Sequence, residues 1–200
     1  MRIIDFLKTL PHVEPAADYL NAVDCYPFLN ALAKDLSARR VLEVGVRFGY
    51  SAVAFIYGNA VEEYVGIDNE SYDSASESKS KCNLEFLNAA QPFRFTLFKR
   101  DTQSLSDLAF LGSRMFDFIH IDGDHSRQGA LTDMKTFWNV LCVGGHMLVD
   151  DSLFIGAVGE ACRDFAELVE EPCYNVKTFR GTWVFLKTTQ SQFPLPGQDA

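Results

Sequence analysis

From residue 40 onward, short apolar runs rich in β-branched residues alternate with longer segments in which apolar positions recur every three or four residues. The short runs predict buried strands, and the longer segments predict helices with one apolar face. Strands are expected at 41–44, 64–67, 94–99, 116–121 and 146–149. Helices are expected at 51–57, in a polar stretch after residue 70, and at 104–111, 128–141 and 158–168. This alternation predicts an α/β fold with a doubly wound, mostly parallel sheet.

Two further runs near the C-terminus, 174–179 and 182–187, flank the short junction formed by Arg180 and Gly181. A glycine-containing junction of this length favours an antiparallel hairpin. We therefore expect the sheet to end in an antiparallel C-terminal hairpin.

The regions on either side of the alternating pattern differ from it. Residues 1–39 have helical spacing and are expected to form an N-terminal helical cap, which covers the sheet or contributes to a homodimer face. Residues 191–200 contain two prolines and a glycine, and are expected to form a flexible tail. The main domain is therefore expected to cover 40–190.

Composition narrows the classes of function. The formal net charge of −9 and the pI near 4.9 have the wrong sign for a protein that gains its affinity by neutralising phosphates, so nucleic acid is not an expected partner. No apolar stretch is long enough to span a bilayer, and residues 1–10 lack the features of a secretory signal. Five scattered cysteines favour reduced thiols, which predicts a cytoplasmic protein.

A glycine-rich turn follows the first expected strand, in the run Glu43, Gly45, Val46 and Gly49. A dinucleotide-binding turn would carry glycine at positions 45, 47 and 50, but arginine and tyrosine stand at the last two. The looser turn instead favours an adenosine ligand without a pyrophosphate, of which S-adenosylmethionine is the common one. These four residues are candidate cofactor-binding residues.

Acidic residues also follow the next two expected strands. Asp68 and Asn69 end the second strand, where a carboxylate can accept hydrogen bonds from ribose hydroxyls. Asp101 and Thr102 follow the third strand, where an adenine edge would lie. Each could instead cap a helix, but acids at consecutive strand ends favour a ligand cleft.

A second acidic cluster follows the fourth and fifth strands, at Asp122 and at the pair Asp150 and Asp151. Neighbouring parallel strands deliver their carboxyl ends to one edge of the sheet, so three carboxylates should meet there. Such a cluster must take up protons or acquire a cation, and oxygen ligands suit Mg²⁺ or another hard divalent ion. The alternative is that Asp151 caps the following helix.

His125 lies three residues after Asp122 and is expected to face the same edge. Near neutral pH, an imidazole there could take a proton from a hydroxyl group, so His125 is a candidate general base. Asp124 is the least certain member of this cluster, and His120 and His146 are expected to be packing residues.

Four stretches between 41 and 151, LEVGVRFGYSA, VGIDNE, FDFIHIDGDHS and GGHMLVDDS, resemble the class I S-adenosylmethionine-dependent methyltransferases, and among them the small metal-dependent O-methyltransferases. The resemblance implies a Rossmann-like class I methyltransferase fold. It further implies that Ser51 binds the methionine carboxylate, that Asp68 binds the ribose, and that Asp122, Asp150 and Asp151 hold the metal ion. Asp122 is also expected to contact the cofactor.

The chain departs from the catechol and caffeoyl-CoA type at two positions. Asp151 stands where those enzymes have asparagine, and His125 stands where they have a catalytic lysine. An Asp-x-x-His element before an acidic pair is more similar to bacterial methyltransferases that act on sugars and antibiotics.

These observations predict metal-assisted O-methylation of a small-molecule hydroxyl, with Asp122 and His125 as catalytic residues and Asp122, Asp150 and Asp151 as metal ligands. Two alternatives remain open. One is a metal-independent methyltransferase that acts on nitrogen or a carboxylate. The other is a catalytically silent S-adenosylmethionine-binding partner protein.

Overall fold

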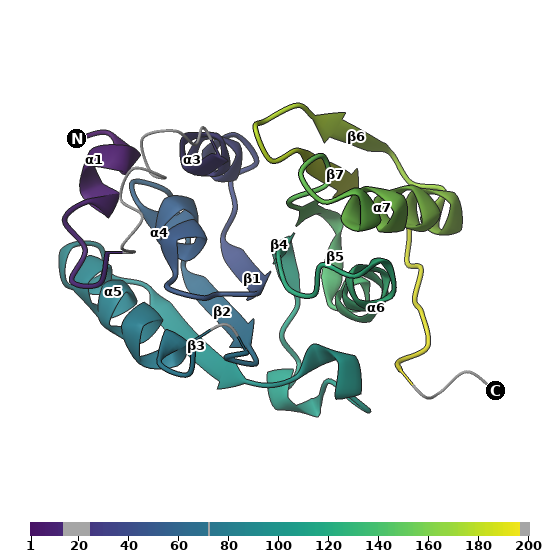
Figure 1. Ribbon diagram of the computed structural model, residues 1–200, viewed down its shortest axis with the longest axis horizontal. Coiled ribbons are helices and arrows are strands. Elements are labelled where there is room, and N and C mark those ends of the chain that lie inside the picture. The colour runs from purple at the N-terminus through teal and green to yellow at the C-terminus, as the bar shows by residue number, and fades with distance from the viewer. Residues whose placement is uncertain (14–24, 72, 197–200) are drawn as a thin grey trace. The chain divides into compact units, whose positions relative to one another are not determined.

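A computed structural model describes residues 1–13, 25–71 and 73–196 of the 200-residue chain (Figure 1). The chain packs as two compact units, Met1–Lys99 and Arg100–Ala200.

The first unit contains three parallel strands, β1 (Arg40–Val44), β2 (Glu63–Asp68) and β3 (Arg94–Lys99), with β2 in the middle. All three strands predicted for this part of the chain are therefore confirmed. β1 and β2 are almost completely buried along their length, which is why both appear in the sequence as continuous apolar runs.

The helices among the described residues of the first unit are α1 (Ile3–Leu7), α3 (Cys25–Asp35), α4 (Tyr50–Ile56) and α5 (Ser76–Ala90). The other three all pack against α4, and Figure 1 shows α3 and α5 beside it. The rings of Phe6 and Tyr57 stack with centroids 4.3 Å apart, so the N-terminal residues join the hydrophobic core of this unit. Within the segment 1–39, predicted to be helical, the described helices are α1 and α3, residues 8–13 and 36–39 are not helical, and 14–24 lie outside the described residues.

The second unit contains strands β4 (Phe116–Ile121), β5 (Leu141–Val149), β6 (Cys173–Val176) and β7 (Thr182–Leu186). They lie in the order β4, β5, β7, β6, and only β4 and β5 are parallel. The antiparallel C-terminal hairpin is therefore confirmed, but β6 ends at Val176 rather than at residue 179. Residues 177–181 form the connection between β6 and β7.

The start of β5 was predicted wrongly, at His146 instead of Leu141. The pairing register of β4 and β5 shifts between Phe116 and Phe118, and Gly144 lies in this part of β5 with a φ of 84°. Because this irregular segment exposes Val143, its sequence lacks the continuous apolar run of a buried strand.

The remaining elements of the second unit are the helices α6 (Arg127–Trp138) and α7 (Gly156–Val169) and the 3₁₀ turns η1 (Thr102–Ser104) and η2 (Ala109–Leu111). The single helix predicted at 104–111 is therefore wrong. Asp101 and Asp107 each accept a backbone N–H two residues ahead, and these local hydrogen bonds compete with a continuous helix.

The core of the second unit is aromatic. Phe165 of α7 packs edge-on against Trp138 of α6 and against Phe185 of β7, with ring centroids 5.3 and 5.2 Å apart. The predicted tail begins attached to this core, because Ser191 accepts a hydrogen bond from the Trp138 indole and the centroid of the Phe193 ring lies 5.8 Å from that of Phe165.

In the part of the chain that the structure describes, no helix is long and apolar enough to cross a membrane. No disulfide joins any of the five cysteines, all of which lie among the described residues.

We predict that Asp133 makes the stability of the protein depend on pH. This carboxylate on α6 is fully buried, and burial raises its pKa to about 7, although hydrogen bonds including that from Gln103 oppose the shift. The folded state thus holds a proton that the unfolded state releases near pH 4. Stability should therefore fall as pH rises between about 4 and 7, by at most about 1.4 kcal/mol per pH unit.

The variant Asp133→Asn should flatten this slope in urea unfolding curves recorded across that pH range. Asp107→Asn is the matched control, because Asp107 is an exposed aspartate shortly before η2. This variant should keep the wild-type slope. An unchanged slope in Asp133→Asn would contradict the assignment.

Candidate functional site

The turn after β1 has the geometry that its glycines predicted. Gly45 and Gly49 have φ values of 87° and 76°, which residues other than glycine rarely adopt. The Gly45 N–H donates to the carbonyl of Ile67 at 2.9 Å, which fixes the turn to the end of β2. A Cβ atom on Gly49 would also lie 3.3 Å from Cβ of Ser80, so the turn and α5 pack closely at this point.

Asp68 holds this turn in place. One carboxylate oxygen accepts the N–H of Arg47 at 2.8 Å, and the other accepts the N–H of Glu70 at 2.6 Å. Its neighbour Asn69 accepts the N–H of Ser71 at 2.9 Å. Because a carboxylate oxygen has two lone pairs, each oxygen of Asp68 keeps the capacity to accept one further hydrogen bond.

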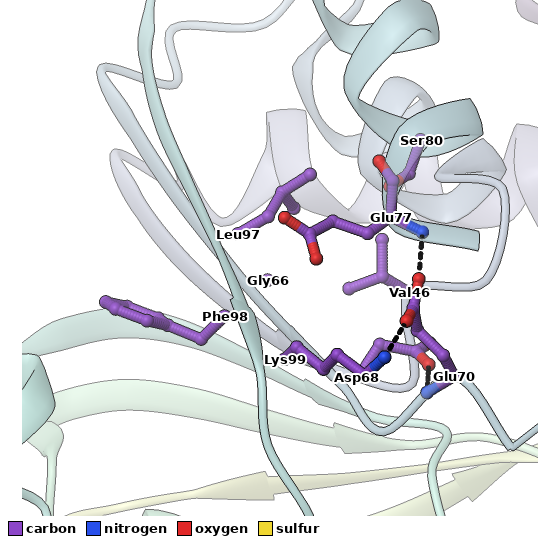
Figure 2. Close-up of a pocket in the computed structure, with 9 residues that line it drawn as sticks. All are labelled: Val46, Gly66, Asp68, Glu70, Glu77, Ser80, Leu97, Phe98 and Lys99. Atoms are coloured by element: carbon purple, nitrogen blue, oxygen red, sulfur yellow. Dashed lines mark hydrogen bonds and ion pairs between the residues drawn. The ribbon is translucent and has the colours of Figure 1, made fainter. Parts of the chain in front are cut away.

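A pocket lies beside Asp68, and Figure 2 shows its walls. Its lining residues are Val46, Gly66, Asp68, Glu70, Glu77, Ser80, Leu97, Phe98 and Lys99. A Cβ atom on Gly66 would lie only 2.7 Å from Val46 and 2.8 Å from Leu97, so these two side chains pack directly over the bare Cα of Gly66. Lys99 forms an ion pair with Glu70 at the polar side.

Two other cofactor-site candidates of the first unit lie in different environments. Glu43 is fully buried in β1 and accepts a hydrogen bond from the hydroxyl of Tyr64 in β2. Burial, together with the charge of Glu43, raises the pKa of Tyr64 well above its ordinary value. Ser51 is half-buried in the first turn of α4.

The candidates after β3 belong to the second unit. Asp101 caps η1 by accepting the N–H of Gln103 at 3.1 Å. Helix capping was the alternative to cofactor binding that the sequence left open for this residue. Thr102 is buried, and its hydroxyl lies next to the buried carboxylate of Asp133.

The second acidic cluster forms as predicted, entirely within the second unit. Asp122, His125, Asp150 and Asp151, which we call the acidic centre, converge at the ends of β4 and β5. Nε2 of His125 lies 3.3 Å from Oδ1 of Asp122 and 3.4 Å from Oδ2 of Asp151. Ligand atoms of Asp122, His125 and Asp151 are close enough to hold a metal ion, as are those of His120, Asp122 and Asp150.

The sequence-based prediction missed one member of this site, Arg180, in the connection between β6 and β7. Its guanidinium donates to both carboxylate oxygens of Asp151. Nη2 also lies 3.3 Å from Oδ1 of Asp122, and Nη1 lies 3.7 Å from Oδ2 of Asp150. The signal that could have found Arg180 was the excess of negative charge, which called for a cation.

The charges within the acidic centre shift its pKa values. Burial and the charge of Asp122 raise the pKa of Asp150 to about 6, while the Thr182 hydroxyl donates to Asp150 at 2.9 Å. Burial opposes ionisation of Asp122, but the hydrogen bond from His125 and the charge of Arg180 bring its pKa below the ordinary value. The hydrogen bond to Asp122 in turn raises the pKa of His125.

The backbone directs Asp151 toward Arg180. Asp151 has a φ of 63°, in the left-handed region that aspartate and asparagine tolerate better than most residues. The N–H groups of Leu153 and Phe154 both donate to the carbonyl of Arg180, at 2.9 and 3.0 Å. The loop after β5 and the hairpin connection are therefore joined through the main chain as well as through charge.

Three other polar residues near the acidic centre, Asp124, His120 and His146, differ in their packing and burial. Asp124 accepts the N–H of Ser126 at 2.7 Å, and a Cβ atom on Gly129 would lie 2.2 Å from its carboxyl carbon, so Asp124 packs on the start of α6. His120 is fully buried in β4. His146 is half-buried in β5, and burial lowers its pKa.

We predict that Asp68→Asn loosens the turn after β1. The amide offers one acceptor oxygen where two N–H groups now bind, so one backbone donor loses its partner, at a cost of roughly 1–3 kcal/mol. Hydrogen exchange at Arg47 or Glu70 should accelerate. Asp107→Asn, at an exposed aspartate that accepts one backbone N–H, is the control and should leave exchange at both positions unchanged. Wild-type protection in Asp68→Asn would count against this role.

A family model described as a methyltransferase domain matches residues 42–152, more than half of the chain. A Dictyostelium discoideum protein named Probable caffeoyl-CoA O-methyltransferase 3 is 28% identical over 134 residues. The match covers 65% of this chain and only half the length of that relative.

Solved structures resemble the chain along most of its length. The O-methyltransferase TomG from Streptomyces achromogenes, in complex with SAM, has a TM-score of 0.62 at 18% identity and covers 94% of this chain and 87% of its own. An O-methyltransferase from Bacillus cereus, in complex with SAH, has a TM-score of 0.59 at 18% identity, with coverages of 92% and 90%. The likeness confirms the predicted class I methyltransferase fold, with its mostly parallel, Rossmann-like sheet.

Proposed function

The chain belongs to the methyltransferase family defined by this domain, and from that premise we propose that it transfers a methyl group from S-adenosylmethionine to a hydroxyl oxygen of a small molecule. The observation that carries the proposal is the acidic centre with His125, because it offers a proton acceptor and fixed charges at one point. The name of the curated relative and those of the two solved structures, all O-methyltransferases, support oxygen as the acceptor atom.

The pocket beside Asp68 suits the adenosine part of this cofactor. Val46 and Leu97 offer apolar surface, and Asp68 can accept hydrogen bonds from ribose hydroxyls. Bound in this way, S-adenosylmethionine would supply a methyl group that its positively charged sulfur makes reactive toward nucleophiles.

His125 is the residue that we propose as general base. The proton of the acceptor hydroxyl would move to its imidazole, while Asp122 and Asp151 stabilise the imidazolium through their charges. Because the hydrogen bond to Asp122 raises the pKa of His125, the neutral, proton-accepting form requires a pH above the ordinary value of about 6.5. Methyl transfer should therefore be slow in acid and rise as His125 loses its proton.

The prediction that Asp122, Asp150 and Asp151 bind Mg²⁺ stays a prediction. Their oxygens are of the type that hard divalent ions prefer, but Arg180 already contacts all three carboxylates. While the guanidinium stays in place, an ion held by Asp122, His125 and Asp151 would compete with it for the carboxylate oxygens, and we assign no step of the reaction to a metal. A cytoplasmic location and a small-molecule acceptor are part of the same proposal.

We predict that His125→Ala lowers kcat by about a hundredfold or more, because general-base catalysis is lost, while the affinity for S-adenosylmethionine is retained. The assay is formation of the methylated product from a panel of sugars, phenols and other small hydroxyl compounds, followed by mass spectrometry. His146→Gln, at a half-buried histidine of β5, is the control and should keep activity. Product carrying the methyl group on nitrogen or a carboxylate would favour the first alternative, and cofactor binding without any product would favour a silent partner protein.

We predict that turnover survives removal of divalent ions. Activity measured after dialysis against EDTA should match activity in added Mg²⁺, because Arg180 already neutralises part of the acidic centre. Loss of turnover in EDTA with full recovery in Mg²⁺ would instead establish metal-assisted O-methylation.

A further inference from the structure

Arg180 lies where the ligands of a metal ion would converge. Oδ1 of Asp122 and Oδ2 of Asp151 both lie within 3.4 Å of Nε2 of His125. Nη2 of Arg180 contacts the same two oxygen atoms. An ion coordinated by this set of atoms would therefore compete with the guanidinium nitrogen for the same two oxygen atoms.

Arg180 is held in position both by its backbone and by its guanidinium group. Its carbonyl accepts two N–H groups from the loop after β5, and the next residue, Gly181, has a φ of 78°. A Cβ atom on Gly181 would lie 2.4 Å from Leu153, so the hairpin connection and the loop are in close contact. At the other end, the guanidinium is bound by Asp151, and the side chain of Arg180 is only 15% exposed.

The charges of the acidic centre are consistent with one resident cation. Asp122, Asp150 and Asp151 are three carboxylates, and the single guanidinium leaves a formal charge of two negative units if His125 is neutral. A buried like-charge cluster of this size requires an opposite charge or protonation. Arg180 supplies that opposite charge from the chain itself.

We propose that Arg180 is the resident cation of the acidic centre and takes the place of a divalent metal ion, so that guanidinium and metal exclude each other. This inference concerns only the cation and does not depend on methyl transfer. It makes Arg180 a positioning residue, which holds Asp122 and Asp151 against His125.

Metal binding tests the inference directly, with Mn²⁺ as the probe and the electron paramagnetic resonance signal of free Mn²⁺ as the readout. The wild-type protein should bind Mn²⁺ with a Kd of about 1 mM or weaker, and Arg180→Met should bind it about tenfold tighter or more. Arg163→Met removes an exposed arginine of α7 and is the matched control, which should bind as the wild type does.

A double variant separates occupancy of the position from overall charge. Asp151→Asn with Arg180→Met removes one negative and one positive charge, so the formal charge of the centre equals that of the wild type. If the guanidinium occupies the position of the ion, this double variant should also bind Mn²⁺ about tenfold tighter than the wild type. Binding equal to the wild type would mean that charge alone governs affinity, and would overturn the exclusion.

Unfolding temperatures provide a second readout. Arg180→Met should unfold at a lower temperature than the wild type, because three carboxylates lose their counter-charge, and added Mn²⁺ should restore it more than it stabilises the wild type. Arg180→Lys, which keeps a charge without the two-pronged geometry, covers the case in which Arg180→Met does not fold, and should bind Mn²⁺ more tightly than the wild type. Micromolar Mn²⁺ binding by the wild type, or no gain in any Arg180 variant, would overturn the inference.

Discussion

Three carboxylates at the ends of β4 and β5 cannot remain charged together without a nearby cation, and this electrostatic constraint governs the acidic centre of the second unit. Asp150 and Asp151 are almost completely buried, so water cannot screen them. Arg180 meets the constraint with one guanidinium that contacts all three side chains. The remaining excess of negative charge is visible in Asp150, whose pKa is raised to about 6.

The two acidic regions of the chain satisfy their carboxylates in different ways. Asp68 accepts hydrogen bonds from two backbone N–H groups. One belongs to Glu70, two residues further along the chain, and the other to Arg47 in the turn after β1. Asp151 receives its hydrogen bonds from Arg180, which lies 29 residues further along. The first arrangement is built from turns next to the strands, whereas the second requires the hairpin of β6 and β7 to be in place. Hairpin formation is therefore a condition for a stable acidic centre.

This difference also explains what the sequence could predict. The strands of the described residues and the meeting of Asp122, Asp150 and Asp151 followed from apolar runs and from the parallel pairing of β4 with β5. The start of β5 was missed because its irregular, exposed segment has no strand pattern. Arg180 was missed because the position of a guanidinium in a hairpin connection depends on tertiary pairing, which no periodicity records. The sequence nevertheless contained the physical requirement for it, since the clustered carboxylates needed a cation.

Asp151 and Arg180 are best understood as one pair. The φ of 63° at Asp151 would accept asparagine at least as well, so the backbone does not explain why an acid stands there. The guanidinium does explain it, because Arg180 donates to both oxygens of Asp151 and an amide has only one acceptor oxygen. Asparagine at position 151 would leave one of these donors without its partner, and a neutral side chain at position 180 would leave the third carboxylate uncompensated. The acid and the arginine therefore form a single electrostatic unit, and the hairpin that carries Arg180 belongs to the acidic centre as fully as β4 and β5 do.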